Sequence, residues 1–290
     1  MRDPLPIGLI GAGPWARMVT GPLLAAGPQT RIAGVWSRHP KHAAELAIQL
    51  GVPSFTDLDT LFEKCEAVAI AITPAAQPEL AARAARAGKA LLLEKPLALD
   101  VAGARTIVDA VHTAGVGALV MLTYRFNPPL GPFLEQCARI EPLGGRGCFI
   151  SGAFLGGPFA RGWRLERGAV LDVGPHLLDL HEAALGEIVA VHAIGDPLGW
   201  TSITCTHASG AISDAAICCS AATDSRTSLE VFGRAGVAIY DGRALDFDAL
   251  ANRLRADFVA VARGADHPAN VDRALHLQEL IAQIESQLLR

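Results

Sequence analysis

The stretch Ile7-Gly8-Leu9-Ile10-Gly11-Ala12-Gly13-Pro14-Trp15-Ala16 decides the fold, because it joins an apolar strand to a helix through a glycine turn. The turn fits the pattern G-x-G-x-x-A. Gly11 permits the tight turn, Gly13 lets the backbone approach a pyrophosphate, and Ala16 permits close packing of helix on strand. The phosphates of a dinucleotide would then lie at the helix N-terminus, with Pro14 in its first turn. The alternative is an ordinary glycine-rich turn, and the position between a strand and a helix favours the dinucleotide.

Strand-like and helix-like segments alternate up to about residue 122 and are joined by short turns. Such alternation predicts a doubly wound parallel sheet. Gly51, Gly88 and Gly115 each follow a helical run and are expected to cap it. The expected strands are 5–10, 31–36, 67–72, 90–94 and 117–122, and the expected helices are 14–26, 40–50, 77–87 and 100–114.

The rhythm changes after Tyr124, where Asn127-Pro128-Pro129 breaks the chain. The chain is therefore predicted to be an α/β protein with two domains, a Rossmann dinucleotide domain (1–123) and an α+β domain (124–290) built on a large, mostly antiparallel open sheet. The terminal helices pack either in the second domain or back on the first. The segments expected here are helices 130–140, 173–185, 247–263 and 271–289 and strands 147–155, 188–195, 200–208, 211–219, 226–232 and 236–240.

Composition excludes several classes of protein. The net charge of −4 gives no electrostatic reason to bind nucleic acid or anionic lipid. No apolar stretch approaches the roughly 20 residues of a membrane span, and no signal peptide is expected. The six cysteines lack CxxC spacing, and the adjacent Cys218 and Cys219 should face opposite ways on a strand. We therefore expect a cytoplasmic protein with reduced thiols and no metal site.

The tripeptide Glu94-Lys95-Pro96 closes the apolar run 90–93, which predicts a buried strand. Because parallel strands end at one edge of the sheet, Lys95 should face the dinucleotide. A surface lysine is the ordinary interpretation, but the strand-end position and Pro96, a candidate for a cis bond, favour a fixed side chain. A lysine beside a nicotinamide indicates redox chemistry at a carbonyl or hydroxyl group.

The end of the second strand bears on the choice of cofactor. An enzyme that uses NAD usually carries an acidic residue here to bind the ribose 2′-hydroxyl, whereas this chain has Ser37 and Arg38. Serine can bond a 2′-phosphate and Arg38 can pair with it, so NADP is favoured over NAD; Arg38 as a solvated helix-start residue is the alternative. Thr73-Pro74 ends the third strand and either lines the nicotinamide side or only terminates the strand.

Asp172, His176 and Asp179 are spaced i, i+4 and i+7 and so share one helix face. A histidine flanked by carboxylates suits proton transfer. Two readings stay open, since Asp172 could equally be a helix N-cap and His176 a packed core residue. Three further histidines have no comparable setting and are interpreted as structural: His181, His207 and His276.

Taken together, these motifs resemble the glucose–fructose oxidoreductase / inositol dehydrogenase / MocA-like family over nearly the whole chain. The resemblance is carried by the glycine turn, Thr73-Pro74, Glu94-Lys95-Pro96, Tyr124-Arg125-Phe126-Asn127-Pro128 and Asp172-x-Gly174-x-His176-x-x-Asp179. It implies a Rossmann domain followed by an open-sheet domain that often forms the subunit interface. We therefore expect a homodimer or homotetramer.

The resemblance also implies roles for individual residues. Lys95 and His176 would flank the reacting carbon with Asp172 beside them, and either of the first two could exchange the proton. Substrate contacts would come from Arg125, Asn127, Trp163, Arg164 and Asp179. The cofactor would contact Gly11, Ala12, Gly13, Pro14, Trp15, Ser37, Arg38, Thr73, Pro74, Gln77, Glu94 and Lys95.

The chain departs from the family in two places that bear on the substrate. Gln77 stands where many members carry a histidine near the nicotinamide, and the glycine cluster before Asp172 is reduced to Gly168. The function expected is hydride transfer between NAD(P) and a carbon bearing a hydroxyl or keto group of a sugar, polyol or related compound. The alternatives are a dinucleotide-binding sensor without catalysis and a reductase of a non-sugar carbonyl. Lys95, Asp172 and His176 together favour the enzyme, since a sensor needs none of them.

Overall fold

The computed structural model describes residues 3–243 and 245–288. By its internal contacts the chain divides into two units. Unit 1 comprises Met1–Met121 and Ala251–Leu275, and unit 2 comprises Leu122–Leu250 and His276–Arg290. The chain therefore returns to unit 1 after the second sheet, and the two final helices each contain a unit boundary.

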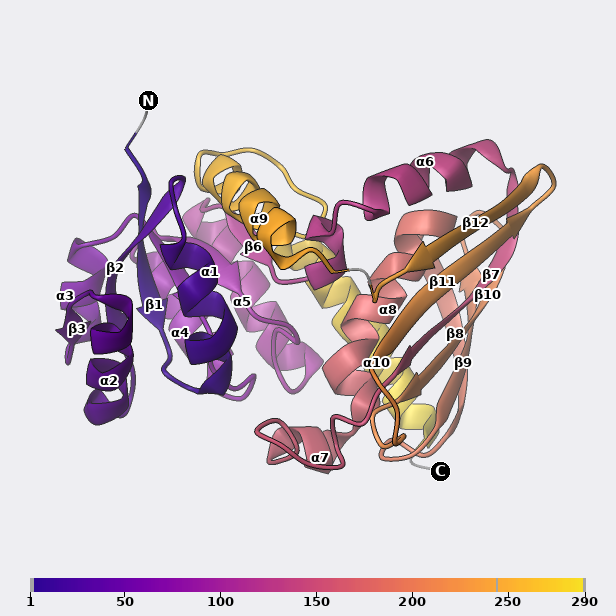
Figure 1. Cartoon of the computed structure of the whole chain (residues 1–290), viewed down its shortest axis with the longest axis horizontal. Coiled ribbons are helices and arrows are strands. Elements are labelled where there is room, and N and C mark those ends of the chain that lie inside the picture. Colours follow the sequence, from indigo (N-terminus) through magenta and orange to yellow (C-terminus); the bar gives the residue numbers. More distant parts are fainter. Residues whose placement is uncertain (1–2, 244, 289–290) are drawn as a thin grey trace. The chain divides into compact units, whose positions relative to one another are not determined.

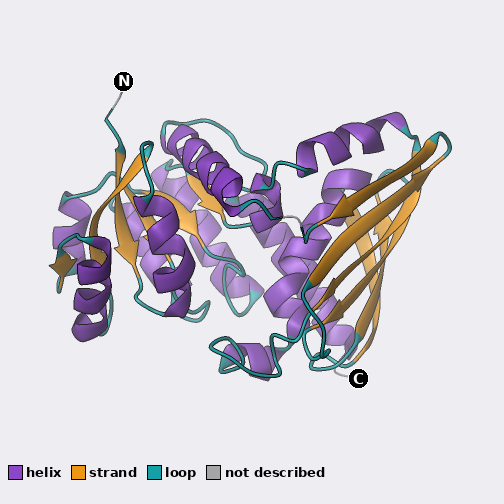
Figure 2. Cartoon of the chain, in the orientation of Figure 1, coloured by secondary structure: helices purple, strands orange, loops and turns teal. Residues whose placement is uncertain are grey.

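Unit 1 is built on a six-stranded parallel sheet in the order β3-β2-β1-β4-β5-β6 (Figures 1 and 2). The order reverses between β1 and β4, which is the switch point where doubly wound sheets bind ligands. All residues of β4 and β5 are buried, as expected for central parallel strands. The strands are β1 (Leu5–Ile10), β2 (Thr30–Trp36), β3 (Ser54–Phe55), β4 (Ala67–Ile70), β5 (Ala90–Leu93) and β6 (Ala118–Val120).

The helices of unit 1 begin and end at the residue types that the sequence indicates. Gly51 and Gly115 lie in the left-handed conformation directly after α2 and α5, and Gly88 has a positive φ just after α4, so the three predicted caps are confirmed. Asp100 accepts the Gly103 N–H and starts α5. The helices are η1 (Ala16–Thr20), α1 (Gly21–Ala25), α2 (Pro40–Leu50), α3 (Leu58–Glu63), α4 (Gln77–Arg86), α5 (Val101–Ala114) and most of α9 (Phe247–Ala262).

Unit 2 is built on a second six-stranded sheet in the order β12-β11-β7-β10-β9-β8. Only β7 and β10 pair parallel, and the other neighbours are antiparallel, so the prediction of a mostly antiparallel sheet is confirmed. The strands are β7 (Pro142–Ile150), β8 (Ile188–Gly195), β9 (Thr201–His207), β10 (Ile212–Cys218), β11 (Arg226–Gly233) and β12 (Gly236–Asp241).

Helices cover one face of this second sheet, as Figure 1 shows within unit 2. A buried cluster joins α6 to the sheet through Phe133, Leu229, Val231 and Tyr240, and α8 contributes Leu180 to the same core. The helical segments of unit 2 are η2 (Thr123–Phe126), α6 (Leu130–Arg139), α7 (Trp163–Arg167), α8 (Ala169–Leu185) and the greater part of α10 (Val271–Leu288).

Two predicted boundaries in unit 2 were wrong. The strand expected over 147–155 is β7, which begins at Pro142 and ends at Ile150, because Gly144 and Gly145 pair within the sheet instead of forming a turn before it. The helix expected from 173 begins at Ala169. Asp172 therefore lies in the first turn of α8 and is not its N-cap, a position that Gly168 occupies.

Candidate active site

The glycine turn (Gly11–Ala16) has the geometry that its pattern predicts. Gly11 has a φ of +119°, and a Cβ on it would lie 2.3 Å from the carbonyl oxygen of Ala71. Its N–H donates to the carbonyl of Trp36 at 2.8 Å. Gly11 is thus wedged between the ends of β2 and β4, and only glycine fits there.

Gly13, in contrast to the crowded Gly11, faces open space. It is exposed, and a Cβ built on it would meet nothing within 4 Å. Helical backbone begins at Pro14, directly after it. The first N–H groups of a helix have no partners within that helix, so they favour an anion in this open space. The turn fits the pyrophosphate of a dinucleotide.

Two more predicted segments lie at the ends of strands in the same sheet. Ser37 and Arg38 follow β2, where the Ser37 hydroxyl accepts the N–H of His39 at 3.3 Å and Arg38 is exposed. Thr73 and Pro74 follow β4 in a short turn. Thr73 is exposed and Pro74 is buried.

Lys95 follows β5 and is half-buried, and the Lys95–Pro96 peptide is cis. The backbone on both sides of Lys95 is held by Gln77, which is fully buried. The Gln77 amide nitrogen donates to the carbonyls of Glu94, Pro96 and Leu97 at 2.8, 3.2 and 2.9 Å, and its oxygen accepts the Glu94 N–H at 3.1 Å. In unit 1 the side chain of Gln77 thus fixes the backbone of the turn that carries Lys95.

The carboxyl ends of β1, β2, β4 and β5 place all these segments at one edge of one sheet. Every predicted cofactor residue is therefore in unit 1 and at this edge: Gly11, Ala12, Gly13, Pro14, Trp15, Ser37, Arg38, Thr73, Pro74, Gln77, Glu94 and Lys95. The residues predicted to act on the substrate together with Lys95 belong to unit 2.

In unit 2, the predicted face of α8 carries two carboxylates that are each paired with arginine. Asp172 is buried, and its Oδ2 accepts from Arg164 Nε at 3.1 Å. The Arg164 guanidinium also stacks on Trp163 at 4.5 Å and on Phe159 at 5.4 Å from the ring centroids. The short helix α7 thus presents Arg164 to Asp172. The guanidinium is held in place by the Asp172 carboxylate and by the two aromatic rings.

His176 lies one turn further along the same face and is 8% exposed. The ring of Tyr124 packs edge-on against it, with ring centroids 5.6 Å apart at 80°. The Tyr124 hydroxyl donates to Thr227 on β11 at 2.7 Å, and burial raises the pKa of that phenol. Tyr124 therefore stays protonated and tied to the sheet, where its ring limits the orientations open to His176.

The other predicted substrate residues have partners within unit 2. Asp179 is 2% exposed and forms a two-pronged ion pair with Arg125. Asn127 is also 2% exposed, and its amide nitrogen donates to the Tyr240 hydroxyl at 2.8 Å. Asp179 and Asn127 are therefore each held by a partner inside unit 2.

Sequence reasoning did not identify the contacts that orient the candidate residues. Tyr124 lies inside the motif that carried the resemblance, but spacing gives no sign that its ring reaches His176. Gln77 was predicted as a cofactor contact and a departure from the family, but not as a residue that holds the lysine turn. Gln77 stands at the start of α4, between the third strand and the strand that ends before Lys95. This position was the signal from which its four hydrogen bonds to the lysine turn could have been predicted.

Two family models match the chain. Residues 5–122 match the model described as an oxidoreductase family with an NAD-binding Rossmann fold. Residues 145–239 match the model of the GFO/IDH/MocA C-terminal domain. Together they cover most of the chain, and they separate at the change from unit 1 to unit 2.

Curated relatives match over shorter stretches. A D-apiose dehydrogenase of Paraburkholderia graminis is 35% identical over 45% of this chain and 36% of its own length. A levoglucosan dehydrogenase of Pseudarthrobacter phenanthrenivorans is 28% identical over 54% of this chain and 43% of its own length. The matches with these two relatives thus span less than half the length of each. Among solved structures, GenD2 from gentamicin A biosynthesis in complex with NAD has a TM-score of 0.86 at 21% identity, over 100% of this chain and 95% of that one, which shows the fold.

Proposed function

The chain belongs to the Gfo/Idh/MocA oxidoreductase family, and on that premise we propose that it is an NAD(P)-dependent oxidoreductase. It would transfer hydride between the nicotinamide and a carbon that bears a hydroxyl or keto group. Its substrate would be a sugar, a polyol or a related small molecule. The dehydrogenases of D-apiose and of levoglucosan among its relatives support this substrate class.

One observation carries the proposal. The carboxyl ends of four strands bring the glycine turn, Ser37-Arg38, Thr73-Pro74 and Lys95 to one edge of one sheet. Gly13 is open exactly where a phosphate needs access to backbone N–H groups. A dinucleotide bound there would place its nicotinamide end toward the later strands of the edge, where Lys95 lies.

We assign the acid–base chemistry to His176 and Lys95. When bound, the dinucleotide supplies or accepts the hydride. Neutral imidazole, with a reference pKa of about 6.5, suits His176 to exchange the proton of the substrate oxygen. The Lys95 ammonium would donate a hydrogen bond to the same oxygen and stabilise negative charge that develops there. The reverse division of the two roles is the alternative.

Asp172 would act on His176 through its negative charge. The hydrogen bond from Arg164 holds the Asp172 carboxylate in place on α8, one helical turn before His176. An ionised carboxylate there favours the charged imidazole after proton transfer. Arg125, Asn127, Trp163, Arg164 and Asp179 would supply the substrate contacts.

We propose NADP as the preferred dinucleotide. Ser37 and Arg38 stand where an acidic residue would bind the ribose of NAD and repel a 2′-phosphate. The exposed guanidinium of Arg38 and the Ser37 hydroxyl are both suited to a phosphate. We also propose a cytoplasmic location, because the six cysteines are scattered along the chain without CxxC spacing. Among the described residues, no helix is both long and apolar enough to span a bilayer.

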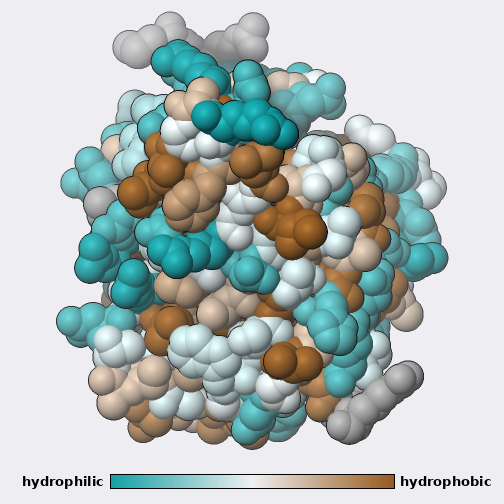
Figure 3. All heavy atoms as spheres, turned by 90° about the vertical axis from the view of Figure 1, so that its right-hand side faces the viewer, coloured by the Kyte–Doolittle hydropathy of each residue, from teal (hydrophilic) through white to brown (hydrophobic). Residues whose placement is uncertain are grey.

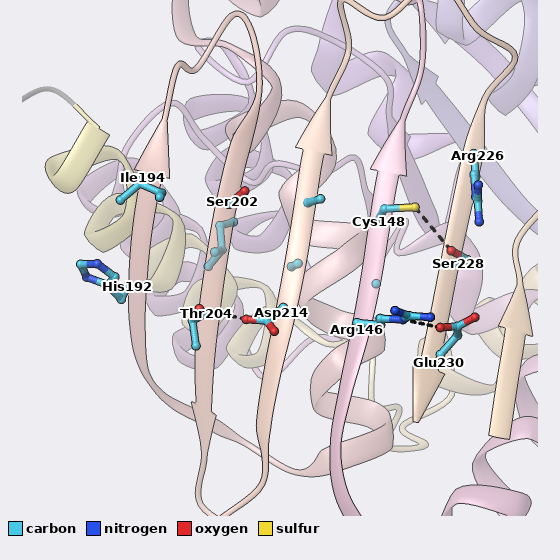
Figure 4. Close-up of a pocket in the computed structure, with 14 residues that line it drawn as sticks. Arg146, Cys148, His192, Ile194, Ser202, Thr204, Asp214, Arg226, Ser228 and Glu230 are labelled. Carbon is cyan, nitrogen blue, oxygen red and sulfur yellow. Dashed lines mark hydrogen bonds and ion pairs between the residues drawn. The ribbon is translucent and has the colours of Figure 1, made fainter. Parts of the chain in front are cut away.

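We further propose that a second copy of the chain covers the face of the second sheet that the helices leave exposed. Apolar side chains gather there in several patches between polar ones (Figure 3). The exposed apolar residues of this open face include Ile194, Ile212, Phe232 and Ile239. An open depression of about 460 Å³ lies on this face, lined by residues of five strands that include Ile194 (Figure 4).

This open face carries both basic and acidic side chains. Arg146 pairs with Glu230 at 2.5 Å, and Thr204 donates to Asp214 at 2.9 Å. A twofold axis presents the same patch to itself, so cations and anions on one patch can meet their opposites on a second copy. Light scattering should find a dimer or tetramer at micromolar concentration, and Ile239→Asp should dissociate it. Ile48→Asp should not, because Ile48 is also exposed but lies on α2 in unit 1. A monomeric wild type would contradict the proposal.

The function itself is tested by a screen of polyols, sugars and glycosides with NADP⁺ and NAD⁺. Production of reduced nicotinamide with at least one compound is the expected result, and a higher kcat/KM with NADP⁺ would support the cofactor preference. Dinucleotide binding without turnover across the panel, in both directions of reaction, would favour the sensor. Absence of dinucleotide binding would reject both.

A further inference from the structure

The side chain of Glu94 links the turn that carries Lys95 to the helix of the glycine turn. The indole Nε1 of Trp15 donates to Glu94 Oε1 at 2.6 Å. The hydroxyl of Thr20 donates to the same oxygen at 3.4 Å. Both donors lie on the helical segment that follows Gly13, whereas Glu94 directly precedes Lys95.

A local irregularity of the helix makes this double contact. Residues five apart lie about 140° from each other around an α-helix, so Trp15 and Thr20 would not normally reach one atom. Ala16–Thr20 forms a π-helical turn, which widens the helix between them. Such turns are frequent at functional sites.

The other end of the link is rigid. Gln77 holds the N–H and carbonyl of Glu94 and the carbonyls beyond Lys95. The backbone of the lysine turn is therefore fixed to α4, and the Glu94 side chain connects this turn to the helical segment that follows the glycine turn. A hydrogen bond from an indole N–H to a carboxylate is charge-assisted and directional. A shift of the Trp15 indole would therefore move the Glu94 carboxylate and, through it, the neighbouring Lys95.

We propose that Trp15 is a positioning residue for Lys95: a pyrophosphate on the glycine turn fixes Trp15, and the Trp15–Glu94 hydrogen bond transmits this to Lys95. The inference rests on the proposed function, since it needs a dinucleotide at this turn. A ligand that favours one arrangement of Trp15 shifts the population toward it. The coupling is reciprocal, so the state of Lys95 also influences the affinity of the turn.

The test uses ADP, which carries the adenosine and the pyrophosphate but lacks the nicotinamide and its ribose. ADP therefore leaves the nicotinamide end of the site empty, and a purely through-space effect of its charge on Lys95 would persist in Trp15→Phe. The readout is the rate at which an amine-acylating reagent labels Lys95, measured by mass spectrometry of its peptide. Lys89 is the internal reference, because it lies before the amino end of the same strand and donates to the carbonyl of Cys65.

In the wild type, saturating ADP should change the Lys95 labelling rate relative to Lys89 by about fivefold or more, the lower end of usual coupling between sites. At ADP concentrations that saturate each protein by calorimetry, Trp15→Phe should lose this response. Trp36→Phe is the matched control, since it removes an indole hydrogen bond of unit 1 that goes to Thr56 and not to Glu94; at saturating ADP it should keep the response.

The outcomes separate the inference from the proposed function. If the wild type binds ADP but Lys95 does not respond, or if Trp15→Phe responds as the wild type does, the inference is wrong and the proposed function stands. If the wild type binds neither ADP nor NADP, both fail. Should Trp15→Phe no longer bind ADP, Glu94→Gln decides, because it weakens the same bond from outside the glycine turn and should also lose the response.

Discussion

Arg125 and Asp179 form a two-pronged ion pair inside unit 2, with the Arg125 Nε and Nη2 atoms 2.7 and 2.8 Å from the two carboxylate oxygens of Asp179. The Arg125 and Asp179 side chains are only 11% and 2% exposed. Removing one member of a buried pair leaves an uncompensated charge, which typically costs about 3–5 kcal/mol. Arg125→Met should therefore lower the free energy of unfolding by about that amount in urea.

The double variant Arg125→Met/Asp179→Leu is the control. Because it leaves no buried charge, it should recover most of the lost stability. A cost below about 1 kcal/mol for Arg125→Met, the range of surface pairs, would mean that this ion pair contributes little to stability.

Gly13→Asp should abolish or strongly weaken dinucleotide binding. Its side chain would occupy the open space above the turn, and its negative charge would face the phosphates. Calorimetry with NADPH provides the measurement. Gly131→Asp is the matched control, because Gly131 also faces open space but lies on α6 in unit 2; it should bind as the wild type does. Equal affinities for the two variants would remove the glycine turn as the phosphate site.

Arg38→Ala should weaken the binding of NADPH more than that of NADH. The guanidinium can pair with a 2′-phosphate, which NADH lacks, and a bond between charged groups contributes about 1.5–3 kcal/mol, or roughly tenfold or more in affinity. The dissociation constants of both dinucleotides, measured for both proteins, decide the question. A variant that loses equal affinity for the two would show that Arg38 does not distinguish them.

The free energy of unfolding should fall as the pH is lowered below about 6.5, because of His181. This histidine is completely buried; burial first, and repulsion from His207 second, lower its pKa from 6.5 to about 3. Between these values the unfolded chain binds a proton that the folded chain does not. Stability is therefore lost as pH falls, by about 2–3 kcal/mol between pH 6.5 and 4.5.

Urea unfolding across this pH range tests the prediction. His181 Nδ1 lies 2.8 Å from the Ser213 hydroxyl, and His181→Asn places an amide that does not titrate near that position. The variant should show a shallower dependence on pH, whatever its absolute stability. Identical slopes for the two proteins would assign the acid sensitivity to other groups.

The sequence predicted the parallel sheet well because its signals are local. A buried strand such as 90–93 is an uninterrupted apolar run, and Gly51 and Gly115 mark helix ends through a backbone conformation that other residues rarely adopt. The two-residue strand β3 and the short helix α3 gave no comparable signal. Their boundaries depend on pairing with β2 and on the Asp57 cap, where Asp57 accepts the Thr60 N–H at 2.7 Å.

The positions of the candidate residues on strand ends and on one helix could be predicted, but their partners could not. The i, i+4, i+7 spacing correctly put Asp172, His176 and Asp179 on one helix. That Asp172 pairs with Arg164 depends on a loop and a five-residue helix with no periodicity to reveal them. The three histidines interpreted as structural have polar partners in unit 2: His181 and His207 share Ser213, and His276 pairs with Glu182.

Lys95→Met and His176→Ala should each lower kcat by about 10²–10⁴ while dinucleotide affinity stays close to that of the wild type. Hydride transfer to or from a carbonyl carbon must be matched by a proton at its oxygen. Lys95 ends a strand at the predicted cofactor edge, and its backbone is fixed by Gln77. His176 is held by the Tyr124 ring on the face that also carries Asp172.

The measurement needs a substrate from the screen, with kcat and NADPH binding compared for each variant. Lys89→Met and His112→Ala are the matched controls. Lys89 precedes the amino end of the strand that ends before Lys95, and His112 is an exposed histidine paired with Asp272. Both controls should turn over at close to the wild-type rate. A pH dependence of kcat that disappears in His176→Ala would identify the histidine as the proton carrier, whereas its persistence would give that role to Lys95. If Lys95→Met and His176→Ala both turn over within a few-fold of the wild type, the chemistry belongs to other residues.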